Sequence, residues 1–167
     1  MIDHAKKHTF GPVPSRRLGR SLGIDIVPFK TCTYNCIYCQ LGRTTTNTTD
    51  RTEFVQIDSL LSEIHHVLEK NPEIDYLTLS GSGEPTLHSN IGKLISELKR
   101  EFSYPVAVLT NGSLLYQPDV AQSLLQADVV LPTLAADSET VFQCIHRPHP
   151  SIHFDTVVNG IINFTKE

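Results

Sequence analysis

The 167-residue chain contains no apolar run that approaches the roughly 20 residues of a membrane-spanning helix. Its first residues, MIDHAKKHTFGP, lack the apolar segment of a secretory signal peptide. These absences predict a cytoplasmic protein without a membrane partner. The chain also lacks internal repeats and interdomain linkers, and its 40% of hydrophobic residues suffices for one domain with a buried core.

A surplus of basic residues is also missing. The chain has 14 Lys and Arg against 18 Asp and Glu, a formal net charge of -4, whereas nucleic-acid-binding domains usually carry a basic surface. The net charge therefore gives no support for nucleic acid as a partner. A local exception is an N-terminal basic arm, residues 1–21, for which a solvated arm and an RNA or phosphate contact both stay open. Its basic residues are Lys6, Lys7, Arg16, Arg17 and Arg20.

Cysteine is scarce and unevenly distributed. Cys32, Cys36 and Cys39 lie in the run TCTYNCIYCQ, and only Cys144 lies elsewhere. This spacing fits metal-bound thiolates in a reducing compartment better than disulfides. Three thiolates on one loop can bind three irons of an iron-sulfur cluster, which leaves one iron open, as in catalytic metal sites. We expect Cys144 to be a buried or half-buried thiol.

Alternating apolar segments predict an α/β fold. Residues 22–28 alternate between apolar and other residues as a strand does, and short apolar runs typical of buried parallel strands occupy residues 74–80, 106–110 and 129–133. Apolar residues at helical spacing follow in 57–68, 91–102, 118–125 and 154–162, with a shorter helix that Asp137 would cap. This order predicts a parallel sheet with right-handed crossovers and about four βα units.

Polar motifs follow each predicted strand. The cysteines follow the first strand, residues 80–85 the second, 110–112 the third and 133–137 the fourth. Ligands of parallel α/β folds bind at the carboxyl ends of the strands, so we expect the four segments to meet at one site. In the stretch GSGEP, Gly81 and Gly83 allow the backbone to approach a ligand closely.

The spacing CxxxCxxC, with Tyr38 immediately before the last cysteine, resembles the signature of the radical S-adenosylmethionine (SAM) superfamily. The segments FGPVPSRRLGRSLGIDIVPFKTCTYNCIYCQLGRTT, SGSGEPTL, LTNGSLL and HRPHP resemble one branch of it, distantly similar to the tRNA wyosine-synthesis enzymes. The resemblance extends from Phe10 to Pro150. It implies a partial parallel (β/α) barrel, a partial TIM barrel, in which residues 1–167 form a radical SAM core domain without its C-terminal βα units.

The resemblance also implies an enzyme with a [4Fe-4S] cluster on Cys32, Cys36 and Cys39, and S-adenosylmethionine at the open iron. An electron from a one-electron donor would cleave SAM to methionine and a 5'-deoxyadenosyl radical, which abstracts hydrogen from a substrate that the sequence does not specify. The implied cofactor contacts are Tyr38 at the adenine, the motif residues Gly81, Ser82, Gly83 and Glu84 at the methionine amino group, and Thr110 and Asn111 at the ribose or carboxylate.

Alternatives stay open. The cysteines with His146 or His149 would make a structural zinc site in a non-catalytic module, although zinc ligands usually come in closely spaced pairs. A tRNA-modifying enzyme of the wyosine type has only the N-terminal basic residues in its favour. His146, Arg147 and His149 are candidates for acid-base or carboxylate-pairing roles, or for structural ones. Because the fourth strand would keep an open edge, a completing chain or a homo-oligomer is a candidate partner.

Overall fold

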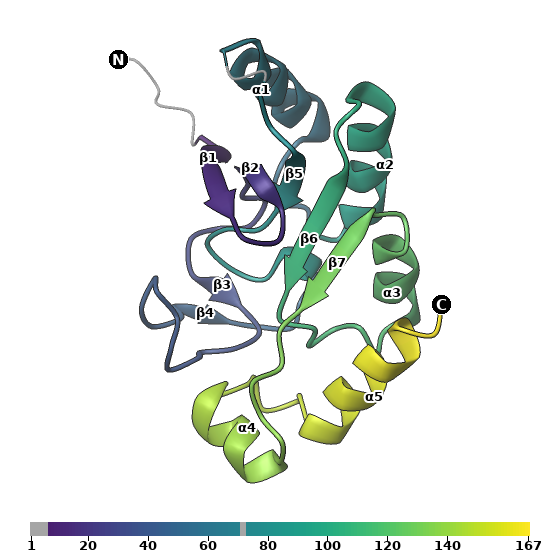
Figure 1. Cartoon of the computed structure of the whole chain (residues 1–167). Coiled ribbons are helices and arrows are strands. Elements are labelled where there is room, and N and C mark those ends of the chain that lie inside the picture. The colour runs from purple at the N-terminus through teal and green to yellow at the C-terminus, as the bar shows by residue number, and fades with distance from the viewer. Residues whose placement is uncertain (1–6, 71–72) are drawn as a thin grey trace.

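The computed structural model describes residues 7–70 and 73–167. Within them lies a five-stranded sheet in the order β1-β2-β5-β6-β7 (Figure 1). β1 is antiparallel to β2, and the other four strands run parallel to one another. A small second sheet pairs β3 with β4. The strands are β1 (Thr9–Ser15), β2 (Gly19–Ile24), β3 (Thr31–Cys32), β4 (Thr46–Asn47), β5 (Tyr76–Leu79), β6 (Val106–Thr110) and β7 (Val129–Pro132).

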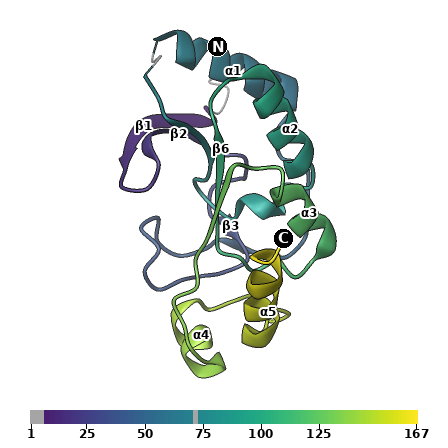
Figure 2. The same cartoon turned by 45° about the vertical axis from the view of Figure 1, so that its right-hand side comes forward.

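Helices alternate with the parallel strands. In Figures 1 and 2, α1, α2 and α3 lie along one side of the sheet, while α4 and α5 lie toward one end. This arrangement confirms the predicted α/β fold with parallel βα units, consistent with a partial (β/α) barrel. The helices are α1 (Ile57–Lys70), α2 (Ile91–Glu101), α3 (Pro118–Leu124), α4 (Glu139–Ile145) and α5 (Phe154–Phe164), with a short 3-10 turn at Pro85–Leu87.

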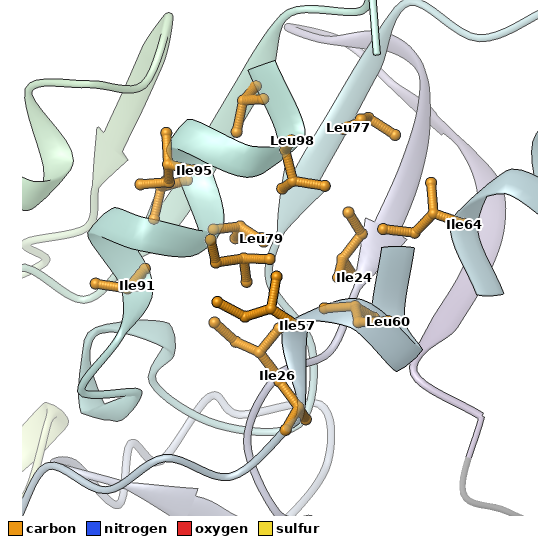
Figure 3. Close-up of a cluster of buried hydrophobic side chains, with 14 of the residues drawn as sticks. Ile24, Ile26, Ile57, Leu60, Ile64, Leu77, Leu79, Ile91, Ile95 and Leu98 are labelled. Carbon is orange, nitrogen blue, oxygen red and sulfur yellow. The ribbon is translucent and has the colours of Figure 1, made fainter. Parts of the chain in front are cut away.

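The core fills the space between the sheet and the helices. The register pairs Ile24 with Leu79 and Leu79 with Val108, so alternate residues of neighbouring strands face the same side. Each fully buried aliphatic side chain stabilises the fold by about 1.5–3 kcal/mol. This layer therefore fixes the strands and the start of every loop at their carboxyl ends. The helix residues that meet the strands in Figure 3 are Ile57, Leu60 and Ile64 from α1, and Ile91, Ile95 and Leu98 from α2.

The N-terminal hairpin departs from the predicted elements. The stretch expected as a basic arm, residues 1–21, forms β1 and the start of β2 from Thr9 onward; Lys6 lies outside the described residues. Contacts distant in sequence hold β1, because Glu63 of α1 accepts hydrogen bonds from the backbone nitrogens of His8 and Thr9 and from Thr9 Oγ1. The segment TFGPVPS shows no alternation of apolar and polar residues, so its sequence alone did not predict a strand.

Smaller corrections concern three other elements. The first parallel strand begins at Gly19 and ends at Ile24, rather than covering 22–28, because the chain leaves the sheet at Asp25. The helix after β7 is capped by Ser138 rather than Asp137, since Ser138 Oγ accepts from Val141 N. Cys144 is exposed rather than buried, because α4 buries only Phe142.

One edge of the sheet stays open, as the sequence predicted. β7 pairs with β6 and with no other strand among the described residues. In the same ranges, no helix has both the length and the apolar character to cross a membrane.

We predict that Glu63→Gln lowers the free energy of unfolding by about 1 kcal/mol, because the amide cannot accept all the hydrogen bonds of the carboxylate. Burial favours the neutral form of Glu63, but hydrogen bonds from Thr9 and His8 outweigh it and lower the pKa below its ordinary value of 4.5. The contribution is therefore present above pH 4.5 and is lost as the pH falls through the lowered pKa.

Denaturant unfolding at about pH 7 and about pH 3 measures this effect, and the difference between wild type and Glu63→Gln should shrink at the acid pH. The control is Glu69→Gln, an exposed position on the same helix whose ion pair with exposed His66 is long (3.8 Å); we expect a change of no more than about 0.5 kcal/mol at either pH. Equal stability of wild type and Glu63→Gln near neutral pH would contradict the assigned anchor.

Candidate functional site

The three clustered cysteines lie on the loop that follows β2. Cys32 ends β3, and Cys36 and Cys39 follow in a turn closed by a hydrogen bond from Cys39 N to Cys36 O (3.2 Å). All three are free and partly exposed. Figure 1 shows β3 and β4 on the side of the sheet toward which β6 and β7 run. The loop therefore presents three thiols at the carboxyl ends of the parallel strands.

The segment HRPHP, which follows α4, lies alongside the cysteine loop. Tyr34 forms an isolated antiparallel bridge with Pro148, and its ring packs edge-on against Phe142 at 5.5 Å between centroids. This distant segment thus fixes the loop between the first two cysteines. The backbone hydrogen bonds run from Asn35 N to the carbonyl oxygens of His146 and Arg147 (both 3.0 Å), from Ile37 N to Ile145 O (2.9 Å) and from His149 N to Thr33 O (2.8 Å).

The GSGEP loop approaches the cysteine loop from the other side. Lys30 N donates to Ser82 O (2.9 Å), and Glu84 N donates to Thr31 O (3.2 Å). A Cβ atom added at Gly83 would lie 1.8 Å from Thr31 O. Because a backbone oxygen cannot yield by that distance, this contact requires glycine.

A cavity of about 410 Å³ lies beside this contact. Its walls come from the N-terminal hairpin, the turn after Cys39 and the GSGEP loop, of which Gly81 and Ser82 line it. Gly81 has a φ of 134°, and Ser82 Oγ donates to the carboxylate of Asp25. The cavity combines polar groups with apolar walls, as small-molecule sites usually do. The remaining lining residues are Lys7, His8, Thr9, Phe10, Gln40 and Leu41.

Glu84 is 2% exposed and holds the carboxyl ends of two strands together. Its Oε1 accepts from Thr86 N (3.1 Å), Thr86 Oγ1 (2.6 Å) and Thr110 Oγ1 (2.6 Å), and its Oε2 accepts from Asn111 N (2.8 Å). Burial raises the pKa of the Glu84 carboxyl, and these hydrogen bonds oppose the rise. The structure thus places Glu84 and Thr110 inside a protein network, where they position the two loops. A contact of either residue with SAM stays a prediction.

Asn111 lies next to the first cysteine. Its Nδ2 is 2.7 Å from Thr33 Oγ1 and 3.6 Å from Cys32 Sγ. Tyr38, expected at the adenine, is 49% exposed, and its hydroxyl lies 3.0 Å from His146 Nδ1. The expected meeting of four segments is therefore present, because the segment after β7 joins through Ala135 N, which donates to His146 Nε2 (3.0 Å).

The donor set fits an iron-sulfur cluster better than a single metal ion. Three sulfurs come from one short loop, which is the usual ligand type of such clusters. Within residues 7–70 and 73–167, no group of three or more His, Cys, Asp or Glu side chains gathers around one metal position. Of the two histidines of the zinc alternative, His149 Nδ1 contacts Ser151 Oγ (2.8 Å). His146 accepts from Ala135 N through Nε2, while its Nδ1 lies beside Cys36 Sγ (3.5 Å).

In the metal-free protein, burial favours the neutral thiol at Cys32 and Cys36. Burial, and then the charge of Glu84, raises the pKa of Cys32 to about 12. Burial also raises the pKa of Cys36. A metal must therefore displace protons to bind here, as is usual for thiolate sites.

One residue at the site, Lys30, was not singled out from sequence, and the role of another, His146, was left open. Lys30, two positions before the first cysteine, is 3% exposed, and its Nζ lies 3.2 Å from Cys39 Sγ. His146 was considered for acid-base or structural roles, and it is fully buried against Cys36 and Tyr38. The motif HRPHP marked His146 in sequence, whereas a lysine in VPFK gave no comparable signal.

Comparison with known proteins places this chain in a family. A model of the Radical SAM superfamily matches residues 26–167, and the chain belongs to that superfamily. It is 42% identical over 157 residues to a UPF0026 protein of Methanocaldococcus jannaschii, covering 93% of this chain and 49% of that protein. It is 39% identical over 159 residues to a UPF0026 protein of Synechocystis, covering 95% of this chain and 59% of that protein.

A protein of Brachyspira hyodysenteriae named "GTPase Obg" is 48% identical over 160 residues, which is 96% of this chain but 24% of that protein. The chain thus spans about half the length of the UPF0026 relatives and about a quarter of the Brachyspira protein.

We predict that Gly83→Ala reduces iron incorporation several-fold, because the new methyl group displaces Thr31 and with it the adjacent Cys32. Iron and sulfide content after anaerobic reconstitution measures the effect. Gly92→Ala is the matched control: Gly92 lies on α2, and its new methyl group would meet the movable side chain of Ser123 (2.8 Å to Oγ) rather than backbone near a cysteine. We expect wild-type iron content from this variant. Equal iron content in Gly83→Ala and wild type would argue against the contact.

We predict that Glu84→Gln lowers the free energy of unfolding by about 1–3 kcal/mol, because the amide nitrogen brings donors to a place already surrounded by N–H and O–H donors. Denaturant unfolding of the metal-free protein tests this. Glu53→Gln changes the same chemical group at an exposed position and should leave the stability unchanged. A similar small effect in both variants would show that the Glu84 network is not needed.

Proposed function

We propose that this chain is the cluster-binding core of a radical SAM enzyme in which Cys32, Cys36 and Cys39 bind a [4Fe-4S] cluster. The observation that carries the proposal is the position of these cysteines, between the GSGEP loop and Asn111, at the carboxyl ends of the parallel strands. When bound, the cluster and SAM supply a reductive cleavage that yields methionine and a 5'-deoxyadenosyl radical able to abstract hydrogen from a substrate.

The chain's own residues would bind and orient SAM. Gly81 and Ser82 line the 410 Å³ cavity beside the turn that follows Cys39, which supports a methionine-binding role for the loop. Gly83 keeps that loop against the cysteines. Half-exposed Tyr38 offers a ring face for the adenine. We propose that Glu84 and Thr110 position the loops after β5 and β6. Asn111 would donate a hydrogen bond to the sulfur of Cys32.

The proposed reaction needs a one-electron donor. It also needs the reducing conditions of the cytoplasm, because the cysteines must stay free of disulfides to bind a cluster. The open edge of β7 supports pairing with a further strand, supplied by a longer chain or by a second copy. RNA as a partner has weaker support. The turn between β1 and β2 exposes Arg16 and Arg17, but Arg20 forms an ion pair with Glu73 (2.7 Å).

The experiment is anaerobic reconstitution with iron and sulfide, followed by SAM and a strong one-electron reductant. We expect 5'-deoxyadenosine, quantified by mass spectrometry, from wild type, and only background amounts from Cys32→Ala, Cys36→Ala and Cys39→Ala. Cys144→Ala is the matched control, because Cys144 is exposed on α4, and it should retain wild-type product. Full activity in any of the three loop variants, or none from wild type carrying the cluster, would refute the proposal.

A further inference from the structure

Each sulfur of the cysteine loop has one side-chain nitrogen near it, and the three nitrogens come from different segments. Lys30 Nζ lies 3.2 Å from Cys39 Sγ. His146 Nδ1 lies 3.5 Å from Cys36 Sγ, and Asn111 Nδ2 lies 3.6 Å from Cys32 Sγ. These side-chain nitrogens act beside the Tyr38 hydroxyl at Cys36 and a backbone hydrogen bond from Tyr34 at Cys32. One side-chain nitrogen for each sulfur suggests a common role.

The environment of Lys30 directs its ammonium group to sulfur. Lysine is almost never fully buried unless paired, yet none of the ion pairs in the described part of the chain involves Lys30. Its Nζ instead donates to Gly42 O and to Cys39 Sγ. The backbone of Lys30 has a φ of 59°, a conformation that costs energy outside glycine. The buried ammonium thus has a sulfur as one of its two hydrogen-bond partners.

The hydrogen bonds of His146 fix its tautomer. The backbone N–H of Ala135 donates to Nε2 (3.0 Å), so Nε2 carries no proton. In the neutral ring the proton is then on Nδ1, which faces Cys36 Sγ and the hydroxyl of Tyr38 (3.0 Å). The single Nδ1 proton therefore lies between the Tyr38 hydroxyl oxygen and Cys36 Sγ, and the Tyr38 hydroxyl also hydrogen-bonds with Cys36. His146 acts on Cys36 both directly and by orienting Tyr38.

The amide of Asn111 is oriented by the same reasoning. Its Oδ1 accepts from Ser113 N (2.9 Å), so the amide nitrogen must be on the opposite side. That nitrogen has two protons, one directed to Thr33 Oγ1 (2.7 Å) and the other available to Cys32 Sγ. Cys32 therefore also has an N–H donor.

We propose that Lys30, Asn111 and His146 donate hydrogen bonds to the three cysteine sulfurs and thereby raise the reduction potential of the cluster, an inference that rests on the proposed function. Hydrogen bonds to cluster sulfurs are among the features that set the potential. A donor withdraws electron density from a thiolate, and so stabilises the reduced cluster, which has one more negative charge. Lys30 contributes most, because it carries a full charge at a partly buried contact, where the interaction between charges is stronger than in water. All three are positioning residues that act through the cysteines.

The test is a redox titration of the reconstituted chain, with the reduced cluster followed by electron paramagnetic resonance. At the potential where half of the wild-type cluster is reduced, we expect about a tenfold lower reduced-to-oxidised ratio in Lys30→Met, a shift of about 59 mV for a one-electron couple. Lys30→Arg, which retains charge and donors, should recover most of the wild-type potential. Lys93→Met removes the same charge from an exposed position on α2 and should have no effect.

The other two donors give independent tests. His146→Gln retains an acceptor for Ala135 N but loses the Nδ1 proton, and Asn111→Leu removes the amide; both should lower the potential by less than Lys30→Met. His153→Gln, at an exposed site, is the control for His146→Gln. If Lys30→Met fails to bind a cluster, the potentials of His146→Gln and Asn111→Leu test the proposal instead. A cluster-bound variant with an unchanged potential overturns the role of its donor, whereas a wild type that binds no cluster overturns the proposed function itself.

Discussion

The backbone of the GSGEP loop lies against the residues that lead to the first cysteine, with no room for a side chain between them. A Cβ atom at Gly83 would collide with Thr31 O, and backbone hydrogen bonds on both sides of the contact hold the two segments together. Next to this contact, the carboxylate of Glu84 accepts hydrogen bonds from Thr110 Oγ1 and Asn111 N at the end of β6. The position of Cys32 is therefore determined by β5 and β6 as much as by its own loop.

The aliphatic layer between the sheet and the helices makes this contact possible. Leu79 and Val108 occupy equivalent positions in β5 and β6 and are fully buried. A shift of either strand by one residue would turn these side chains to the opposite face, so the hydrophobic layer keeps the strands in register. The same register places the loops after β5 and β6 side by side, where Glu84 and Thr110 meet.

The sequence located the parallel strands and the helices, although not all of their ends, because buried elements repeat apolar residues at the spacing of a strand or a helix. It did not predict β1, whose anchor, Glu63, lies 54 residues from Thr9. The cysteines were identified from local spacing, and that spacing agrees with the family match. The contact between Cys36 and His146 joins residues 110 positions apart, and local spacing carries no information about such a contact.

The HRPHP segment combines two roles in different atoms. Its backbone fixes the loop, since His146 O accepts from Asn35 N, while the His146 ring faces the sulfur of Cys36. Asn111 divides its roles in the same way: its backbone N–H donates to the carboxylate of Glu84, and its side-chain amide lies beside Cys32. Because a side-chain substitution leaves the backbone hydrogen bonds in place, the geometry of the loop and the electronic environment of its sulfurs can be changed separately.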